Sequence, residues 1–272
     1  MSINPILKNH VASFLKSYEQ NLNFPMLIDE VDFIKRTTGF FSKISVRAGQ
    51  DSLTTRSRFL HQTPKILFSH STRCNNPATR ELADLMFITK IKRNGKLFKK
   101  RATIVQAKFT KSNNRKWKGI DSAQLYFISK WPAFTMVSPS PKRKYPAFNS
   151  RSKAWGSYAF VGPNTLNNPV YYGALRVCGL NPSSFSRETF AQDLSNVNGF
   201  DTSPSFLMRH ILCYIGEDLM VNHAVSNFVD DLLRMVNLEP DPPDEFIWDS
   251  KEKSEERVGF GVVEFLVSLE EG

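Results

Sequence analysis

Two apolar runs joined by a short polar link constrain this chain more than any other feature. The runs cover residues 82–92 and 99–109, and the link contains the pair Asn94-Gly95. Asn and Gly tolerate the positive φ angles of a tight turn, so the pair predicts an antiparallel β-hairpin. Both strands are apolar on both faces. This pattern is typical of central strands that are covered on two sides in an α/β protein.

The remaining hydrophobic pattern predicts further elements on both sides of the hairpin. We expect helices at residues 5–22, 26–36, 120–131, 186–195, 203–215 and 222–237, and strands at 65–69, 155–161, 170–177 and 258–267. Residues 37–64 are mixed and predict no clear element. Three prolines and a basic cluster indicate a linker or loop at 139–154. The chain then divides into a core at 1–138, this linker, and a C-terminal α/β elaboration with an acidic tail at 155–272, packed on the core.

Three polar side chains in the hairpin form a candidate site: Asp84, Gln106 and Lys108. Side chains alternate between the faces of a strand, so Gln106 and Lys108 share a face. A two-residue turn would place Asp84 opposite Val105 and on the other face. A three-residue turn, with Gly95 left-handed in a bulge, would bring all three residues to one face. The site requires that second geometry.

These residue types suit phosphodiester hydrolysis. A metal ion neutralises developing charge and lowers the pKa of a bound water. Mg²⁺ prefers one or two carboxylates with waters and phosphate oxygens, which makes Asp84 a sensible anchor. Lys108 would orient or deprotonate the attacking water, or stabilise the transition state. The amide oxygen of Gln106 is a weaker ligand, so a second carboxylate is expected, with Glu81 and Glu19 as the candidates.

The charge distribution favours a polyanionic partner. Residues 85–153 contain 18 Lys or Arg and a single acid, Asp121, whereas residues 239–272 contain eleven Asp or Glu and three Lys or Arg. Binding of phosphates by a concentrated basic surface releases counterions. We expect phosphate contacts from the basic run after the second strand, namely Lys111, Arg115, Lys116 and Lys118. A basic surface that serves solubility alone is the alternative.

Composition also bears on the compartment. No run approaches 18 consecutive apolar residues, so no membrane span is expected. The N-terminal segment predicts an amphipathic helix and not an export signal. Three widely spaced cysteines fit neither a disulfide framework nor a zinc site, which favours the reducing cytoplasm.

The hairpin motif also carries a family resemblance. Glu81-Leu-Ala-Asp84, followed by a strand that ends Gln106-Ala-Lys108, resembles the core of the PD-(D/E)xK nuclease superfamily. The Q-x-K form is similar to the branch that includes the Mrr-type restriction endonucleases. The resemblance covers roughly residues 5–135. It implies an αβββαβ core, a Mg²⁺ cofactor for which Mn²⁺ can substitute, and cleavage of DNA.

The resemblance assigns roles residue by residue. Asp84 matches the metal-binding aspartate, Gln106 the middle position and Lys108 the catalytic lysine. Many members add a glutamate from the first helix, which Glu19 would match. Gln124 resembles a nucleic-acid-binding glutamine that RecB-like members keep in the following helix.

Two functions are therefore open. The first is a Mg²⁺-dependent DNA endonuclease, the nuclease effector of a prokaryotic anti-phage defence or restriction system, acting with partner proteins or as a homodimer. The second is a nucleic-acid-binding protein that keeps the nuclease fold without cutting, because Gln106 stands where an acid would complete the site. RNA is open as a substrate in both, since a basic groove contacts the phosphates of either polymer.

Overall fold

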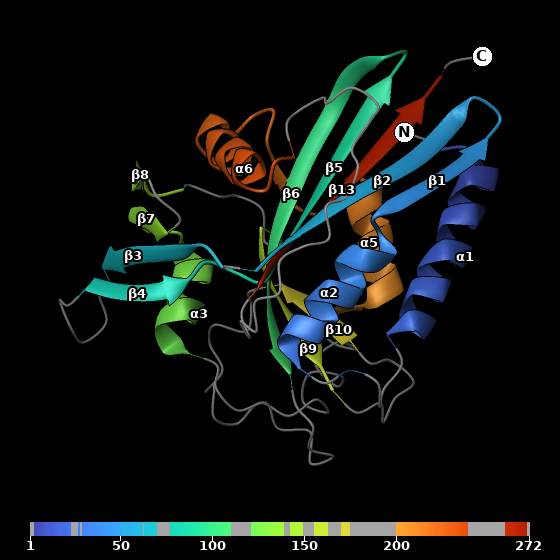
Figure 1. The fold of residues 1–272 in the computed structure, drawn as a ribbon. Coiled ribbons are helices and arrows are strands. Elements are labelled where there is room, and N and C mark those ends of the chain that lie inside the picture. Colours follow the sequence, from blue (N-terminus) through green and yellow to red (C-terminus); the bar gives the residue numbers. More distant parts are fainter. Residues whose placement is uncertain are drawn as a thin grey trace.

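The computed structural model describes residues 3–22, 27, 29–61, 63–69, 77–109, 121–138, 142–148, 155–162, 170–174, 200–238 and 259–270. Within these residues the chain is a mixed α/β protein. A large sheet has helices on both faces, and a smaller sheet lies to one side (Figure 1). The predicted α/β class with a mixed central sheet is confirmed.

Nine strands of the described chain form the large sheet. Eight of them lie in the order β1-β2-β13-β5-β6-β9-β10-β11, and β12 pairs with β6. The pairs β13–β5 and β6–β9 are parallel and the other pairs are antiparallel. The bounds are β1 Lys43–Ala48, β2 Asp51–Leu60, β5 Leu85–Arg93, β6 Lys96–Phe109, β9 Gly156–Val161, β10 Val170–Ala174, β11 Phe200–Thr202, β12 Glu217–Asp218 and β13 Phe260–Leu269.

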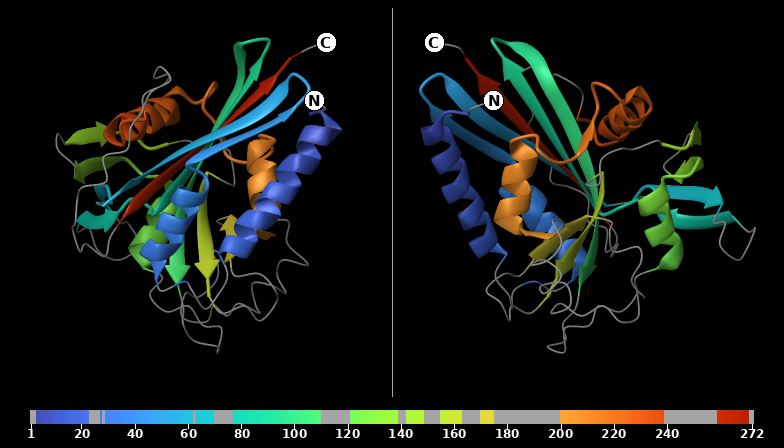
Figure 2. Two further views of the ribbon diagram at one scale, coloured as in Figure 1. Left: turned by 45° about the vertical axis from the view of Figure 1, so that its right-hand side comes forward. Right: turned by 180° about the vertical axis from the view of Figure 1, so that it is seen from behind.

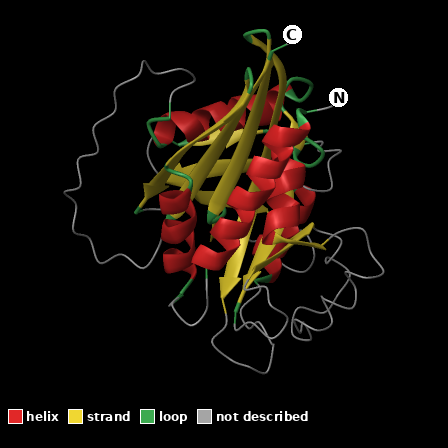
Figure 3. Cartoon of the chain, turned by 90° about the vertical axis from the view of Figure 1, so that its right-hand side faces the viewer, coloured by secondary structure: helices red, strands yellow, loops and turns green. Residues whose placement is uncertain are grey.

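Helices cover the two faces of this sheet in separate groups (Figures 1 and 2). One face carries α1 (Pro5–Asn21), α2 (Glu30–Phe40) and α5 (Ser203–Ile211), which Figure 3 shows in front of the strands. The other face carries α3 (Ser122–Lys130) and α6 (His223–Met235). Successive residues of β5 alternate between the two cores: Leu85 and Phe87 pack with the first group, and Met86 and Ile88 with the second. This explains why both faces of the hairpin are apolar.

The smaller sheet has the strand order β4-β3-β7-β8. Its strands are β3 Lys65–Ser69, β4 Pro77–Glu81, β7 Phe134–Ser138 and β8 Arg143–Tyr145. The chain passes from β4 to β5 through only residues 82–84, so Glu81 at the end of β4 lies three positions before Asp84, which directly precedes β5.

The C-terminal strand β13 lies near the centre of the large sheet. It pairs with β2 on one side and with β5 on the other. The strand β9 pairs in turn with β6. Strands from the segments before and after residues 139–154 therefore alternate within one sheet, and β8 of the small sheet lies inside the predicted linker.

The β5–β6 hairpin places Asp84 on the same face as Gln106 and Lys108, but through a feature that we did not predict. Its turn has two residues, Asn94 and Gly95, with φ angles of 49° and 74°, and Arg93 lies opposite Lys96. The three-residue turn is therefore wrong. A register shift follows, because Ile91 lies opposite Lys99 and Lys92 opposite Leu97, which leaves Phe98 unmatched. This bulge at Phe98 changes the parity of every later pair, so that Leu85 lies opposite Val105.

Most predicted elements are present with shifted ends. The helix expected at 26–36 occupies Glu30–Phe40, and residues 37–64, which predicted no clear element, contain the β1–β2 hairpin. Every second residue in the middle of β2 is deeply buried, but two of these buried residues are Thr55 and Ser57, so no apolar alternation marks this strand in the sequence. The helix expected at 186–195 lies outside the described residues.

Candidate functional site

Asp84 is fixed at the junction of the two sheets. Its backbone N–H donates to the Val105 carbonyl at 3.0 Å, and its own carbonyl accepts from the N–H of Gly261 at 2.8 Å. The neighbouring strands β6 and β13 therefore hold its backbone from both sides. Its side chain is only 5% exposed, which demands partners for a carboxylate.

A chain of amide contacts leads to the Asp84 carboxylate. Oδ2 accepts hydrogen bonds from the Gln106 side-chain amide and, at 2.6 Å, from the backbone N–H of Ala107. The side-chain oxygen of Gln106 accepts in turn from the amide of Gln124 on α3. Gln106 therefore turns its nitrogen, and not its oxygen, toward Asp84. Among the described residues, no hydrogen bond reaches Oδ1 of Asp84, which leaves this oxygen available to a ligand.

The structure brings Glu30, which the sequence analysis missed, to this site. Glu30 begins α2, directly after the N-cap residue Asp29. The helix packs closely on β13 at Gly261, where an added Cβ would lie 2.8 Å from side-chain carbons of Ile34 and Thr38. The helix start thereby reaches the end of β6, and Oε1 of Glu30 accepts from the N–H of Phe109 at 3.1 Å.

Three acids and one lysine act on one another at this point. Burial raises the pKa of Asp84 well above its ordinary value, and the negative charges of Glu30 and Glu81 raise it further. Burial also raises the pKa of Glu30, again with a contribution from Glu81. The charge of Lys108 opposes both shifts. Lys108 shares a face of β6 with Gln106 by strand alternation, and its charge acts on the buried carboxyl group of Asp84 and the half-buried one of Glu30.

The two predicted second acids have different positions. Glu81 ends β4, and β5 starts only at Leu85, so strand alternation does not turn Glu81 away from Asp84. Glu19 lies near the end of α1, where Lys16 is the only charged neighbour that shifts its pKa. The structure does not bring Glu19 to Asp84; Glu30 on the next helix takes that place.

The predicted nucleic-acid contacts are largely outside the described chain. Lys111, Arg115, Lys116 and Lys118 lie outside the described residues. The side chain of Gln124 is 6% exposed and contacts Gln106 and the Glu81 carbonyl. It supports the site from inside the protein.

The donor set fits a hard cation bound partly by water. Among the described residues, no group of three or more His, Cys, Asp or Glu side chains could hold a metal ion by itself. Mg²⁺ does not require such a cage, because it keeps several waters and takes one or two carboxylates. The free Oδ1 of Asp84 and the carboxylate of Glu30 supply oxygen ligands of that kind. Burial raises both pKa values most and repulsion between the acids adds to it, and a cation there would offset both effects.

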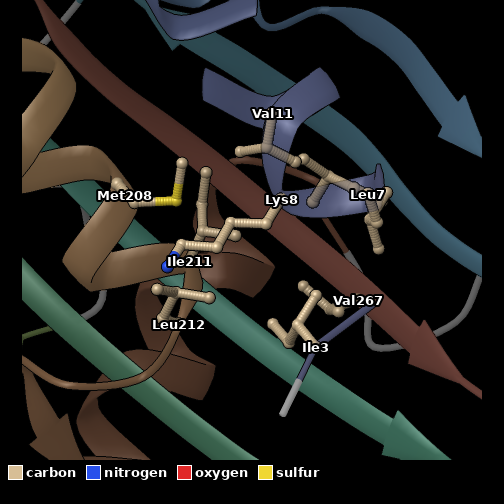
Figure 4. Close-up of a pocket in the computed structure, with 9 residues that line it drawn as sticks. Ile3, Leu7, Lys8, Val11, Met208, Ile211, Leu212 and Val267 are labelled. Atoms are coloured by element: carbon tan, nitrogen blue, oxygen red, sulfur yellow. The ribbon is translucent and has the colours of Figure 1, made fainter. Parts of the chain in front are cut away.

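A separate apolar pocket lies between α1, α5 and β13 (Figure 4). Leu7 and Val11 line it from α1, and Met208 and Ile211 line it from α5. Among the described residues that line it, Lys8 is the only charged one, and none is an acid, a histidine or a cysteine that could bind a metal ion.

No family model, curated protein or solved structure matches the chain. No helix within the described ranges is long and apolar enough to cross a membrane.

The buried charge of Asp84 has a measurable cost in stability. The folded protein holds the Asp84 proton to a higher pH than the unfolded chain, whose value is near 3.8, so stability is lost as the pH rises through the folded pKa. We expect Asp84→Asn, which keeps a hydrogen-bond acceptor, to raise the free energy of unfolding by about 1 kcal/mol at pH 7.5 without metal. Urea unfolding at pH 4 and pH 7.5 in chelator measures the difference. A gain of equal size at both pH values would contradict this origin.

Proposed function

We propose that this protein is a Mg²⁺-dependent nuclease of the PD-(D/E)xK type that hydrolyses phosphodiester bonds of DNA. The observation that carries the proposal is the coupling of Asp84, Glu30 and Lys108 at the end of β6. Two buried carboxyl groups with raised pKa values beside a lysine are costly to maintain without a ligand. Strongly perturbed groups of this kind favour a functional site over a structural one.

The surrounding topology supports the same assignment. The parallel strands β6 and β9 are separated in the chain by α3 and by β7 and β8 of the small sheet, and β5 and β6 form the antiparallel pair that carries the motif. Within the αβββαβ core implied by the resemblance, α2 takes the place of the first helix. Glu30 then replaces Glu19 as the helix glutamate, and β13 is an additional strand beside β5.

Each group at the site has a role in the proposed reaction. Asp84 and Glu30 would bind Mg²⁺, with Mn²⁺ as a substitute and Glu81 contributing negative charge. The bound ion would polarise the scissile phosphate and lower the pKa of a water. The Lys108 ammonium would stabilise the charge that develops on the phosphoryl oxygens and orient the attacking water. Gln106 and Gln124 hold the Asp84 carboxylate in place.

DNA is the proposed polymer because the resemblance implies it and because the hairpin region is strongly basic. The setting we propose is a cytoplasmic defence or restriction system in prokaryotes, with partner proteins or a second copy of the chain. RNA offers the same phosphates and is included in the test. The experiment incubates the chain with supercoiled plasmid, linear duplex, single-stranded DNA and RNA, with Mg²⁺, Mn²⁺ or chelator.

Metal binding can be tested without activity. A ligand at ten times its Kd stabilises the folded state by about 1.4 kcal/mol, so Mg²⁺ should raise the Tm of the wild-type protein by several degrees. Asp84→Asn and Glu30→Gln should each remove most of this shift. Glu19→Gln, at the acid that the structure leaves apart, should keep it. Retention of the full shift in Asp84→Asn would exclude this metal site.

The second function, nucleic-acid binding without cutting, is favoured by one observation. The amide of Gln106 occupies the middle position and offers no charge. If binding persists while no substrate is cut with either metal, the chain is a binding protein on a nuclease fold.

A further inference from the structure

Exposed apolar side chains gather around the outer half of β6, away from the candidate site. Six large apolar residues are exposed in the described chain, and five of them lie on the β5–β6 hairpin or on the segment 213–221. That segment runs beside β6, because β12 pairs with Arg101 and Ala102 and the N–H of Leu219 donates to the Lys100 carbonyl at 2.9 Å. We name this the hairpin-tip surface; its members are Leu97, Phe98, Tyr214, Met220 and Val221.

The bulge at Phe98 presents an aromatic ring on this surface, close to the hairpin turn. Phe98 has no partner on β5 and is 43% exposed. A bulged residue leaves the strand ladder and is aimed differently from its neighbours. The Arg93 guanidinium lies 5.5 Å from the ring centroid and the Lys99 ammonium 5.8 Å from it. The ring is thereby accompanied by two cations.

The hairpin is basic throughout. Residues 85–109 contain eight Lys or Arg and no Asp or Glu. Lys90, Lys100 and Arg101 have acidic partners on other elements. Toward the tip, Lys92, Lys96 and Lys99 form no ion pair with the described residues. Lysines can protect an exposed strand edge from pairing with other chains, but that role does not require an exposed phenyl ring beside them.

We propose that the hairpin-tip surface is a second nucleic-acid contact, which binds a single-stranded segment of the same polymer that enters the candidate site. A base stacks on Phe98, and phosphates pair with Lys96 and Lys99, since aromatic rings set among cations bind single strands without sequence preference. The proposal rests on the proposed function for the identity of the polymer. It adds a contact that the catalytic motif does not provide.

The geometry of β6 predicts the length of strand needed. Ten residues separate Phe98 from Lys108, which is about 33 Å at ~3.3 Å per residue. A strand stacked at ~3.4 Å per nucleotide must therefore have about ten nucleotides to reach both places. A stacked strand shorter than this can occupy only one of them.

The test measures binding in chelator, so that no cleavage is required. Fluorescence anisotropy follows fluorescein-labelled dT20 and dT6 with the full-length chain. Phe98→Ala should weaken dT20 binding about tenfold, as expected for the loss of one stacked base. Ile6→Ala, at the exposed apolar residue on α1, should leave the affinity unchanged. The ratio of the affinity for dT20 to the affinity for dT6 should be larger for the wild-type protein than for Phe98→Ala.

Charge is tested with a matched pair of double variants. Lys96→Gln/Lys99→Gln should reduce the magnitude of the slope of log K against log salt by about 1.4, two phosphates at ~0.7 each. Lys16→Gln/Lys43→Gln removes equal charge from exposed positions on α1 and β1 and should leave the slope unchanged.

Three results would overturn the proposal. The first is that Phe98→Ala binds dT20 as tightly as the wild-type protein does. The second is that Phe98→Ala loses as much affinity for a fully paired 20-base-pair duplex as for dT20. Sedimentation could also show that Phe98→Ala separates a dimer, which would make the surface a contact between copies. The proposed nuclease function can fail on its own: Phe98→Ala would then weaken dT20 binding as expected, while the wild-type protein would cut no substrate with Mg²⁺.

Discussion

Replacing Lys108 with Met should lower Mg²⁺-dependent cleavage of supercoiled plasmid by about a thousand-fold, the size expected for loss of a group that stabilises or protonates the transition state. Lys108 is the cation that opposes the raised pKa values of both Asp84 and Glu30. Its removal takes one positive charge away from the carboxylates and leaves the phosphoryl oxygens without this donor. Single-turnover rates on gel separate this loss from weaker binding.

Two control variants separate the effect of losing a positive charge anywhere on the protein from the effect of losing the ammonium group at position 108. Lys43→Met removes an exposed lysine on β1 and should keep the wild-type rate. Lys108→Arg keeps the charge but not the compact ammonium, and should recover little activity. Anisotropy in chelator should show Lys108→Met binding DNA within about threefold of wild type, because one phosphate contact contributes little. Cleavage by Lys108→Met at the wild-type rate would place the chemistry elsewhere.

The hairpin shows how far local sequence determines structure. Asn94-Gly95 correctly predicts a turn between two buried strands, because those two residues accept the required φ angles. The parity of Asp84 and Gln106 could not be predicted from the turn, since the bulge at Phe98 decides it. Nothing about a Phe between Leu97 and Lys99 indicates that it has no partner. The sequence groups Asp84, Gln106 and Lys108 as one candidate set, while the face they share depended on an unpredicted bulge.

The order of helices along the chain does not identify the glutamate that lies at the site. Glu19 lies on the first predicted helix, which is the position that the family resemblance indicates. Glu30 follows the N-cap Asp29 at the start of α2, a pattern that marks a helix start. That signal could have placed Glu30 at a helix N-terminus. Its approach to β6 depends on tight packing at Gly261, which is distant in sequence.

The position of β13 was beyond sequence reasoning for a similar reason. A strand at residues 258–267 is predictable from its apolar residues, but its partners β2 and β5 are about 175–215 residues earlier. The acidic segment 239–272 could be taken for a removable tail that covers the basic face. Its deletion would instead remove a central strand and the N–H of Gly261 that holds Asp84. Charge substitutions, and not truncation, are the appropriate test of that segment.

The centre of β13 also contains the buried ion pair with the largest expected effect on stability. Glu264 contacts Lys90 on β5, with 2.7 Å between Nζ and Oε1, and Arg56 on β2. The Glu264 side chain is 2% exposed and that of Lys90 11%. Burial acts to raise the pKa of Glu264, but the hydrogen bond from Arg56 and the charge of Lys90 hold it below its ordinary value.

Glu264→Leu should therefore lower the free energy of unfolding by about 3–5 kcal/mol, because it removes the buried carboxylate that pairs with the Lys90 ammonium. Urea unfolding at pH 7 measures the loss. Arg36→Gln, which removes the partly exposed pair with Asp32, should cost less than about 1 kcal/mol. If Glu264→Leu also cost less than about 1 kcal/mol, the Lys90 ammonium would have to be hydrated once its partner is removed.

A second substitution distinguishes the buried charge from simple repacking. Glu264→Leu/Lys90→Met removes both charges and should recover most of the lost stability, since apolar replacements of a buried pair are often neutral. Arg56 needs no replacement, because its side chain is 31% exposed and can turn to solvent. The folded pKa of Glu264 is depressed, so its contribution is fully present above pH 4.5 and is lost as the pH falls through the folded pKa. Wild-type protein should thus lose more stability than the double variant on acidification below pH 4.5, and equal losses would place the origin of acid sensitivity in other carboxylates.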